Sequence, residues 1–313
     1  MSRIDHRPKP YHLILLFPVF FLHGKKGVHN FLRRYHANRL PIQAVCLELN
    51  SPPEIEIIIN STLKDFNHLE EIIKVAVANS INKVNGISIA VPVEYVKVCE
   101  EAITGLVEFP ISVISEDDFL TDTIRSAIRR MSNVRYGWIL QQFLTVDRVL
   151  KSNAKGVLQI NSDTYILRPQ LWLDQGNRQV LMESLEYHQP YYTLLNKLDS
   201  RFKLSPTTHI THHMLFQPEI FRKILQEFQI DNVQDLVTWV ETNSYFDKGN
   251  HSAICIEFEL YAQGLKILFP ELVAEVKFSN YAQASDISNF EFKKLLKQKA
   301  RNYNSMSCHS YLG

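Results

Sequence analysis

Several signatures of familiar enzyme classes are missing from this sequence. It contains no G-x-G-x-x-G, no Walker loop, no G-x-S-x-G and no H-E-x-x-H. These absences argue against Rossmann-type nicotinamide enzymes, P-loop NTPases, α/β-hydrolases and zinc proteases of the H-E-x-x-H type.

The chain is also poor in cysteine, glycine and excess charge. Its four cysteines lie far apart and form no C-x-x-C pair, so neither a zinc cluster nor a small disulfide scaffold is expected. Reduced cysteines favour a cytoplasmic protein. Only 10 glycines and 13 prolines argue against low complexity. The 34 Lys+Arg balance 33 Asp+Glu, so no nucleic-acid partner is predicted.

No hydrophobic run is long enough to cross a membrane. The longest candidate, YHLILLFPVFFL at residues 11–22, falls short of the ~20 apolar residues required, and Pro18 interrupts it. The basic tract after it has no small-residue cleavage site of a secretory signal. Two interpretations remain. One is a buried first element with a solvated basic face, and the other is peripheral contact with an anionic membrane at its inner face.

What the sequence does contain is a core-forming alternation of strands and helices. Residues 1–53, closed by NSPP, are predicted to be an N-terminal extension, and residues 54–313 one domain. The alternation predicts an α/β fold with a mostly parallel central sheet flanked by helices. Predicted strands are 54–60, 86–92, 109–115 and 156–160; helical stretches lie at 61–81, 94–106 and 121–153.

The second half of the domain is predicted with the same rules. Residues 191–198 (YYTLLNKL) are strand-like, and Gly264 is a plausible C-terminal stop of a helix. Residues 266–278 should return as one or two strands. Helices are expected at 217–228, 235–246, 252–265 and 290–304.

Polar side chains end three of the predicted strands: Asn60, the segment 115–117 and the segment 161–163. In parallel sheets, ligands bind beyond the carboxyl ends of the strands. We therefore expect these polar groups to gather at one edge of the sheet.

In the stretch GVLQINSDTYILRP, residues 156–169, a predicted buried strand is followed directly by polar residues that end in a carboxylate. Asn161 and Asp163, two residues apart, face the same side of an extended chain. Their oxygens suit a hard cation, Mg²⁺ or Mn²⁺, which would bridge a diphosphate. The alternative is an Asx turn that caps the strand.

Four motifs, in this order, resemble a group of bacterial glycosyltransferase-like proteins of the GT-A type: YGWILQQ, INSDT, THHMLF and IEFELY. The family pattern is GW-x-x-QQ, D-S-D-T, H-M and an E-x-E-L-Y helix, and the resemblance covers about residues 55–268. It implies a GT-A-like, Rossmann-like fold, a nucleotide-sugar donor, a glycan or lipid-linked glycan acceptor, and polysaccharide biosynthesis. The chain departs from the pattern at Asn161, which replaces an Asp, and Ser252 only loosely replaces the family's serine.

The resemblance also implies roles for particular residues. Trp138, Gln141 and Gln142 would shape the donor pocket, although a core indole with surface amides is the plainer alternative. Arg168 would pair with a diphosphate, or stand as an exposed loop arginine. Donor-binding residues are thus predicted to be Asn60, Trp138, Gln141, Gln142, Asn161, Ser162, Asp163 and Arg168.

Two glutamates are candidates for the catalytic base that an inverting transferase needs near the acceptor hydroxyl. Glu257 and Glu259 point apart by about 200° on a helix, so one should face the site and the other solvent or a lysine. We favour Glu257, with Asp247 in reserve.

Histidines complete the predicted site. His213 matches the family's H-M and is predicted to line the pocket, while an ordinary buried histidine is the alternative. His209, His212 and His213 have poor zinc spacing without a third ligand nearby. By analogy with GT-A enzymes that use a late histidine, His309 joins Asp163 and Asn161 as a metal ligand; a frayed tail is the alternative.

Two rival functions stay open on the sequence. One is a nucleotidyltransferase of similar fold, which also uses strand-end carboxylates and a metal. The other is a catalytically inactive glycan- or nucleotide-binding protein, and the uncharged Asn161 favours it.

Overall fold

A computed structural model describes residues 50–309 of the chain, except for 107, 133–134, 186–188, 203–206, 245–253, 255 and 285–288. Before residue 50 it describes only residues 28, 30–32, 35 and 40. The apolar run at 11–22 and nearly all of the predicted extension therefore lie outside the described residues. No helix in the described part of the chain is long and apolar enough to cross a membrane.

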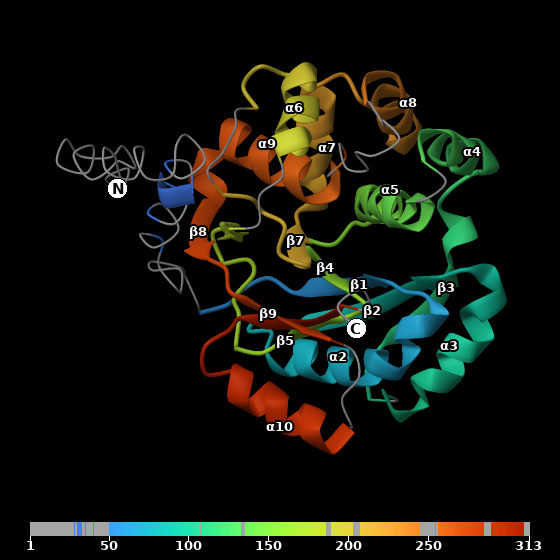
Figure 1. The fold of residues 1–313 in the computed structure, drawn as a ribbon, viewed down its shortest axis with the longest axis vertical. Coiled ribbons are helices and arrows are strands. Elements are labelled where there is room, and N and C mark those ends of the chain that lie inside the picture. The colour runs from blue at the N-terminus through green and yellow to red at the C-terminus, as the bar shows by residue number, and fades with distance from the viewer. Residues whose placement is uncertain are drawn as a thin grey trace.

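Five strands form the central sheet, in the order β3-β2-β1-β4-β7 (Figure 1). The first four run parallel, and β7 pairs antiparallel with β4 at the edge. The predicted α/β class with a mostly parallel sheet is confirmed. The strands are β1 (Ile55–Asn60), β2 (Val84–Val91), β3 (Ile111–Ser115), β4 (Val157–Asn161) and β7 (His213–Phe216).

Helices cover both faces of this sheet (Figure 1). On one face lie α2 (Phe66–Ala78), α3 (Val96–Ala102) and α10 (Asn289–Lys299). On the other face lie α4 (Asp122–Met131), α5 (Tyr136–Lys151), α6 (Gln189–Leu198), α7 (Pro218–Glu227), α8 (Val233–Asn243) and α9 (Tyr261–Leu268). Such double coverage buries the strands on both sides, which explains their nearly continuous β-branched runs.

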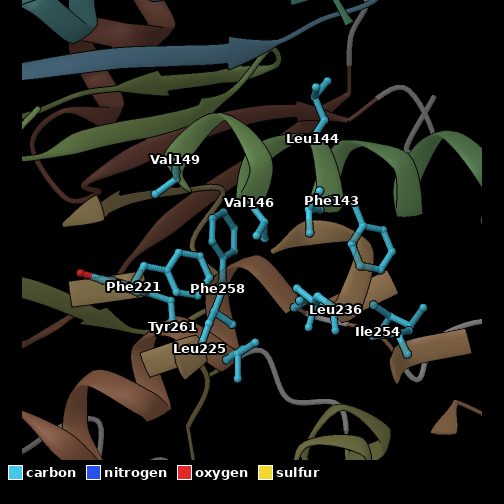
Figure 2. Packing of buried hydrophobic residues seen from close by; sticks show 14 of the residues in the cluster. Phe143, Leu144, Val146, Val149, Phe221, Leu225, Leu236, Ile254, Phe258 and Tyr261 are labelled. Atoms are coloured by element: carbon cyan, nitrogen blue, oxygen red, sulfur yellow. The ribbon is translucent and has the colours of Figure 1, made fainter. Parts of the chain in front are cut away.

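The side chains of each strand alternate between two separate hydrophobic cores. In β1, Ile58 packs into the core shared with α5, whereas Ile57 and Ile59 pack into the core shared with α2. Figure 2 shows the first core, where Phe258 and Tyr261 meet Phe221 of α7 and Val146 of α5. The first of these cores packs α5 against the sheet.

Two smaller sheets extend the domain. One has the order β5-β10-β9, and the other pairs β6 with β8 in parallel. The first lies beside the turn that follows β4, because β5 begins three residues after β4 ends. Their strands are β5 (Thr164–Ile166), β6 (Gln179–Glu183), β8 (Val273–Lys277), β9 (Asn280–Ala284) and β10 (Ser305–His309).

Two predictions for the second half of the chain are wrong. Residues 191–198 are helical, within α6, because Leu194, Leu195 and Leu198 pack into the first core with helical spacing. Gly264 does not end a helix but lies inside α9. A Cβ at that position would come within 2.5 Å of Ile224 Cγ2, so the glycine allows α7 and α9 to approach each other closely.

Residues 266–278 were predicted to form one or two strands, but the first part of this segment is helical. Lys266–Leu268 completes α9, and only Val273–Lys277 forms a strand, β8. The C-terminal tail is likewise ordered into β10 as far as His309, because β10 fills the place between β5 and β9. The alternative of a frayed tail is therefore wrong for residues 305–309.

Candidate functional site

The predicted gathering of polar strand ends is present at the carboxyl edge of the sheet. Asn60, the last residue of β1, is paired in register with Asn161, the last residue of β4. On the other side of β1, Asn60 pairs with Ala90, and Val91 of β2 pairs with Ser115 of β3. The strand order reverses between β1 and β4, so the two asparagines mark the topological switch point.

Asn60 is held under α5. Its side-chain amide donates to Thr145 Oγ1 at 2.8 Å and to the backbone oxygen of Gln141 at 3.2 Å. Its oxygen accepts from the guanidinium of Arg148. Asn60 therefore joins the strand end to the helix that carries the predicted Trp138 and glutamines.

Arg148 is a buried cation that sequence reasoning missed. Its guanidinium donates to the backbone oxygens of Ile59 and Ser88, at 2.9 and 2.6 Å, as well as to Asn60. Burial lowers its pKa to about 9. Three acceptors on two neighbouring strands thus fix α5 to the sheet, at the point where a ligand would lie.

Asn161 already uses its amide oxygen. Gln159, two residues back and on the same strand face, donates to Asn161 Oδ1 at 2.9 Å. The backbone N–H of Asn161 donates to the oxygen of His212. A metal ligand role for Asn161 would require Gln159 to give up this bond.

The turn after β4 brings two carboxylates close together. Ser162 Oγ donates to Asp65 Oδ2 at 2.7 Å, and Asp65 ends the short helix η1 (Leu63–Asp65) after β1. Burial raises the pKa of Asp65, and the negative charge of Asp163 raises it further. Asp163, half-buried, accepts from Thr164 Oγ1 at 3.1 Å.

Sequence reasoning missed Asp65. The available signal was its place: it follows β1 by five residues, at the same edge that was predicted to bind the ligand. Two carboxylates and a serine hydroxyl form an all-oxygen donor set of the kind that Mg²⁺ and Mn²⁺ prefer. Asp163, Asp65 and Ser162 are therefore the residues at this turn that could hold a divalent cation.

The third predicted ligand, His309, reaches this turn through β10. The backbone N–H of Cys308 donates to the oxygen of Asp163 at 2.8 Å, and Ser307 pairs with Thr164. The backbone of His309 follows Cys308 directly. The C-terminal strand thus brings the chain next to the β4–β5 turn, which sequence spacing could not show.

Arg168 serves another element. Its guanidinium donates to the backbone oxygens of Ala300, at 2.7 Å, and Arg301, at the end of α10. These bonds satisfy carbonyls that a helix end leaves without partners. Arg168 is therefore bound to the end of α10 in the structure, and its role at a diphosphate stays a prediction.

The predicted donor-pocket residues of α5 point in different directions. Trp138 is half-buried, and the guanidinium of Arg135 lies 5.3 Å from the centre of its ring. Gln141 is half-buried too, whereas Gln142 is fully buried. Gln142 Oε1 accepts from the backbone N–H of Ile256 at 3.0 Å. Gln142 therefore holds the segment that carries both predicted glutamates.

That segment is a π-helix, η5 (Ile256–Leu260), packed against α5. Both Glu257 and Glu259 are buried in it, so the expectation that one of them faces solvent is wrong. The reason is that η5 packs against α5, while Glu259 also faces the segment of His209, whose backbone N–H donates to it.

The two glutamates differ in their partners. Glu259 accepts from the backbone N–H of His209 and from Gln263 Nε2 at 3.3 Å. Glu257 Oε2 has no partner among the described residues. Burial raises the pKa of Glu257 to about 8. Of the two, Glu257 has the properties of an acid or base.

His213 lies inside the core. Its ring packs edge-on against Trp172 and Phe278, with centroid distances of 5.3 and 5.5 Å. Neither ring nitrogen has a partner in the described part of the chain, and burial lowers its pKa to about 3. A neutral core histidine accounts for this geometry. Asp247 and Ser252 lie outside the described residues.

Comparisons with known proteins yield structural neighbours only. Neither a protein-family model nor a curated protein sequence matches this chain. Among solved structures, mouse xyloside xylosyltransferase 1 in its apo form shares 10% identity at a TM-score of 0.42, over 83% of this chain and 99% of that one. The galactosyltransferase LgtC, in complex with donor and acceptor sugar analogs, shares 11% at 0.39, over 81% and 86%.

A third neighbour is the mannosyltransferase Ktr4p of S. cerevisiae, with 10% identity and a TM-score of 0.41, over 78% of this chain and 74% of that one. All three are glycosyltransferases by description. Likeness of this degree concerns the path of the chain and carries no residue roles with it.

Proposed function

We propose that this protein is a glycosyltransferase that moves a sugar from a nucleotide-sugar donor to a hydroxyl group of a glycan. The observation that carries the proposal is the carboxyl edge of the sheet at its switch point. There Asn60 and Asn161 are paired, and Asp65 is bonded to Ser162, the neighbour of Asp163, in the turn after β4. In open α/β sheets, this is where nucleotides bind.

The acidic turn would hold the diphosphate of the donor through a divalent cation. A cation bound there supplies charge neutralisation to the leaving nucleoside diphosphate. Asp163 and Asp65 would provide the charged oxygen ligands, and Ser162 holds Asp65 in place by its 2.7 Å hydrogen bond. Because Asn161 brings no charge, Asp65 offsets the loss of a carboxylate within this turn.

Glu257 is the residue that we assign to the acceptor. A base must take the proton of the acceptor hydroxyl as the new bond to the sugar forms. A carboxyl group with a pKa of about 8 is a far stronger base than an ordinary glutamate. Its unpartnered oxygen, the only one of its kind on η5 among the described residues, is available for that proton.

The proposal is tested by calorimetry with UDP, with and without Mn²⁺. Wild-type protein should bind UDP only with the metal, and D163A and D65N should each lose about tenfold or more of that affinity. N161D should bind more tightly, because it restores a charge. The matched control E271Q, at an exposed site, should bind as the wild type does.

Three results would contradict the proposal. Binding without any metal dependence, together with no turnover of a panel of sugar nucleotides, would favour an inactive binding protein. A preference for nucleoside triphosphates over diphosphates would favour a nucleotidyltransferase. Full UDP binding by a folded D163A variant would remove the acidic turn from the site.

A further inference from the structure

A second cluster of titratable side chains lies away from the acidic turn. Glu183 is the last residue of β6, and Glu275 lies on the neighbouring strand β8. His209 belongs to the segment before β7, and Glu259 comes from the π-helix η5. Four segments that are far apart in sequence therefore bring ionisable groups to one place.

This cluster is almost completely removed from solvent. His209 and Glu259 are 0% exposed, and Glu183 is 1% exposed. Buried carboxylates are costly unless they are paired or bind a metal. The access route is through Glu275 and Lys266, whose side chains are 21% and 27% exposed.

The hydrogen bonds of His209 leave one ring nitrogen ready to bind. Nδ1 lies 3.4 Å from Glu259 Oε2, while the other oxygen of Glu259 accepts from the backbone N–H of His209. In the tautomer with the proton on Nδ1, toward the carboxylate of Glu259, Nε2 carries a lone pair. Nε2 is buried, has no hydrogen-bond partner in the described residues, and lies 3.9 Å from Glu183 Oε1.

Carboxylates outnumber ammonium groups among the described residues of the cluster. Three carboxylates, Glu183, Glu259 and Glu275, lie around one ammonium, Lys266, which bonds to Glu183 at 2.9 Å and to Glu275. A concentration of buried carboxylates favours a bound cation.

We propose that Glu183, His209 and Glu275 form a binding site for a divalent transition-metal ion of the zinc class. Their ligand atoms all lie within 4.8 Å of one another. Two ligands of a tetrahedral zinc ion stand about 3.3 Å apart, given metal–ligand bonds of about 2.0 to 2.1 Å. The 3.9 Å between His209 Nε2 and Glu183 Oε1 closes to this value with a small side-chain movement.

The surroundings of the three ligands are those of a metal site. Glu259, His209 and the ion would form a carboxylate–histidine–metal series, which orients the imidazole and raises its basicity. Thr207 Oγ1 donates to Glu183 Oε2, which orients that carboxylate. An imidazole combined with two carboxylates favours zinc-class ions over Mg²⁺, which takes oxygen ligands. This site is therefore chemically distinct from the acidic turn.

Lys266 competes with the ion, because its ammonium bonds to two of the ligand carboxylates. Its partial exposure lets the side chain swing toward solvent when the ion enters. Removing the ammonium should therefore tighten metal binding. The bound ion would join β6, β8 and the His209 segment, so it should raise the melting temperature of the native chain.

The test uses the full-length chain, stripped of metal by a chelator and titrated with Co²⁺ and Zn²⁺. We expect saturable binding, a visible Co²⁺ absorption band and a higher melting temperature with Zn²⁺. H209Q and E275Q should each weaken binding by about 100-fold or more, at the upper end of what lost metal-site contacts cost. K266M should bind more tightly, while E271Q should bind as the wild type does.

Circular dichroism and a melting curve establish that each variant is folded. Should H209Q fail to fold, wild-type crystals with zinc give the answer, through an anomalous peak at the zinc edge beside His209 Nε2. The proposal is overturned by a lack of saturable binding below about 1 mM, or by undiminished binding in folded H209Q. An anomalous peak only at the acidic turn would overturn it as well.

Discussion

Gln142 of α5 and Ile256 of η5, which are 114 positions apart, are joined by a 3.0 Å hydrogen bond from the backbone N–H of Ile256 to the side-chain oxygen of Gln142. This bond anchors the first residue of the π-helix that carries Glu257 and Glu259. A glutamine that looked like a donor-binding residue thus positions the segment with the candidate base.

Replacing Gln142 by Leu should lower the free energy of unfolding by about 1 to 3 kcal/mol, because the buried N–H of Ile256 loses its partner. Urea denaturation measures this difference. The neighbouring Gln141→Ala is the matched control, since Gln141 is half-buried and uses only its backbone oxygen for Asn60. Equal losses in the two variants would contradict a special role for Gln142.

Replacing Arg148 by Lys should cost about 2 to 4 kcal/mol of stability, because one ammonium cannot reach all three acceptors that the planar guanidinium reaches. Arg130→Lys is the control: Arg130 pairs with Glu241 on the surface, so its change should stay within about 0.5 kcal/mol. Urea denaturation curves of both variants measure these differences in the free energy of unfolding. If the free energy of unfolding of R148K equals that of the wild type, the contacts of Arg148 are dispensable for stability.

Alanine at position 264 should destabilise the chain by about 1 to 3 kcal/mol, because its Cβ would overlap Ile224 Cγ2. The double variant G264A/I224A should lose less stability than the sum of the two single variants, since I224A removes the overlapping methyl. Melting temperatures and urea midpoints of all four proteins complete the cycle. Simple additivity would mean that the two positions do not meet.

Stability should fall between pH 5 and pH 8 in a manner that depends on Glu257. Its pKa is about 8 in the folded chain, raised by burial from an ordinary value of 4.5. Between these two pH values the folded state holds a proton on Glu257 that the unfolded state has lost. The contribution of this proton to the free energy of unfolding is therefore complete below about pH 4.5 and is lost as pH rises through 8. The slope is at most about 1.4 kcal/mol per pH unit.

Urea denaturation at several pH values measures that slope. E257Q cannot titrate at this position, so its stability should vary less with pH than that of the wild type. The exposed E271Q should keep the slope of the wild type. Identical pH curves for wild type and E257Q would show that Glu257 has an ordinary pKa.

Local pattern was enough to predict much of the fold. The β-branched runs of β1 to β4 and the helical spacing of α2, α5, α7 and α8 were recognised because a buried strand or an amphipathic helix repeats along the chain itself. The prediction failed at residues 191–198, where a short apolar stretch suits a strand as well as a helix. The helix α6 forms there because Leu194, Leu195 and Leu198 pack into the first core.

The candidate site was predictable in its position but not in its contacts. Polar residues at the ends of parallel strands must meet at one edge, so Asn60 and Asn161 could be placed together from sequence alone. Their partners could not. Arg148 reaches Asn60 from a helix and Gln159 reaches Asn161 from the same strand, and nothing in a local repeat selects one polar partner over another.

For the histidines too, the sequence and the tertiary structure supply different information. Sequence spacing rejected zinc for His209 because no third ligand lies nearby in the chain, yet Glu183 and Glu275 stand next to it in space. The sequence by itself determined the alternation of strands and helices and the edge where polar strand ends collect, because both follow from backbone geometry and hydrophobic period. Only the tertiary structure decided which buried charges meet, because those contacts join segments that approach each other through packing of the two cores.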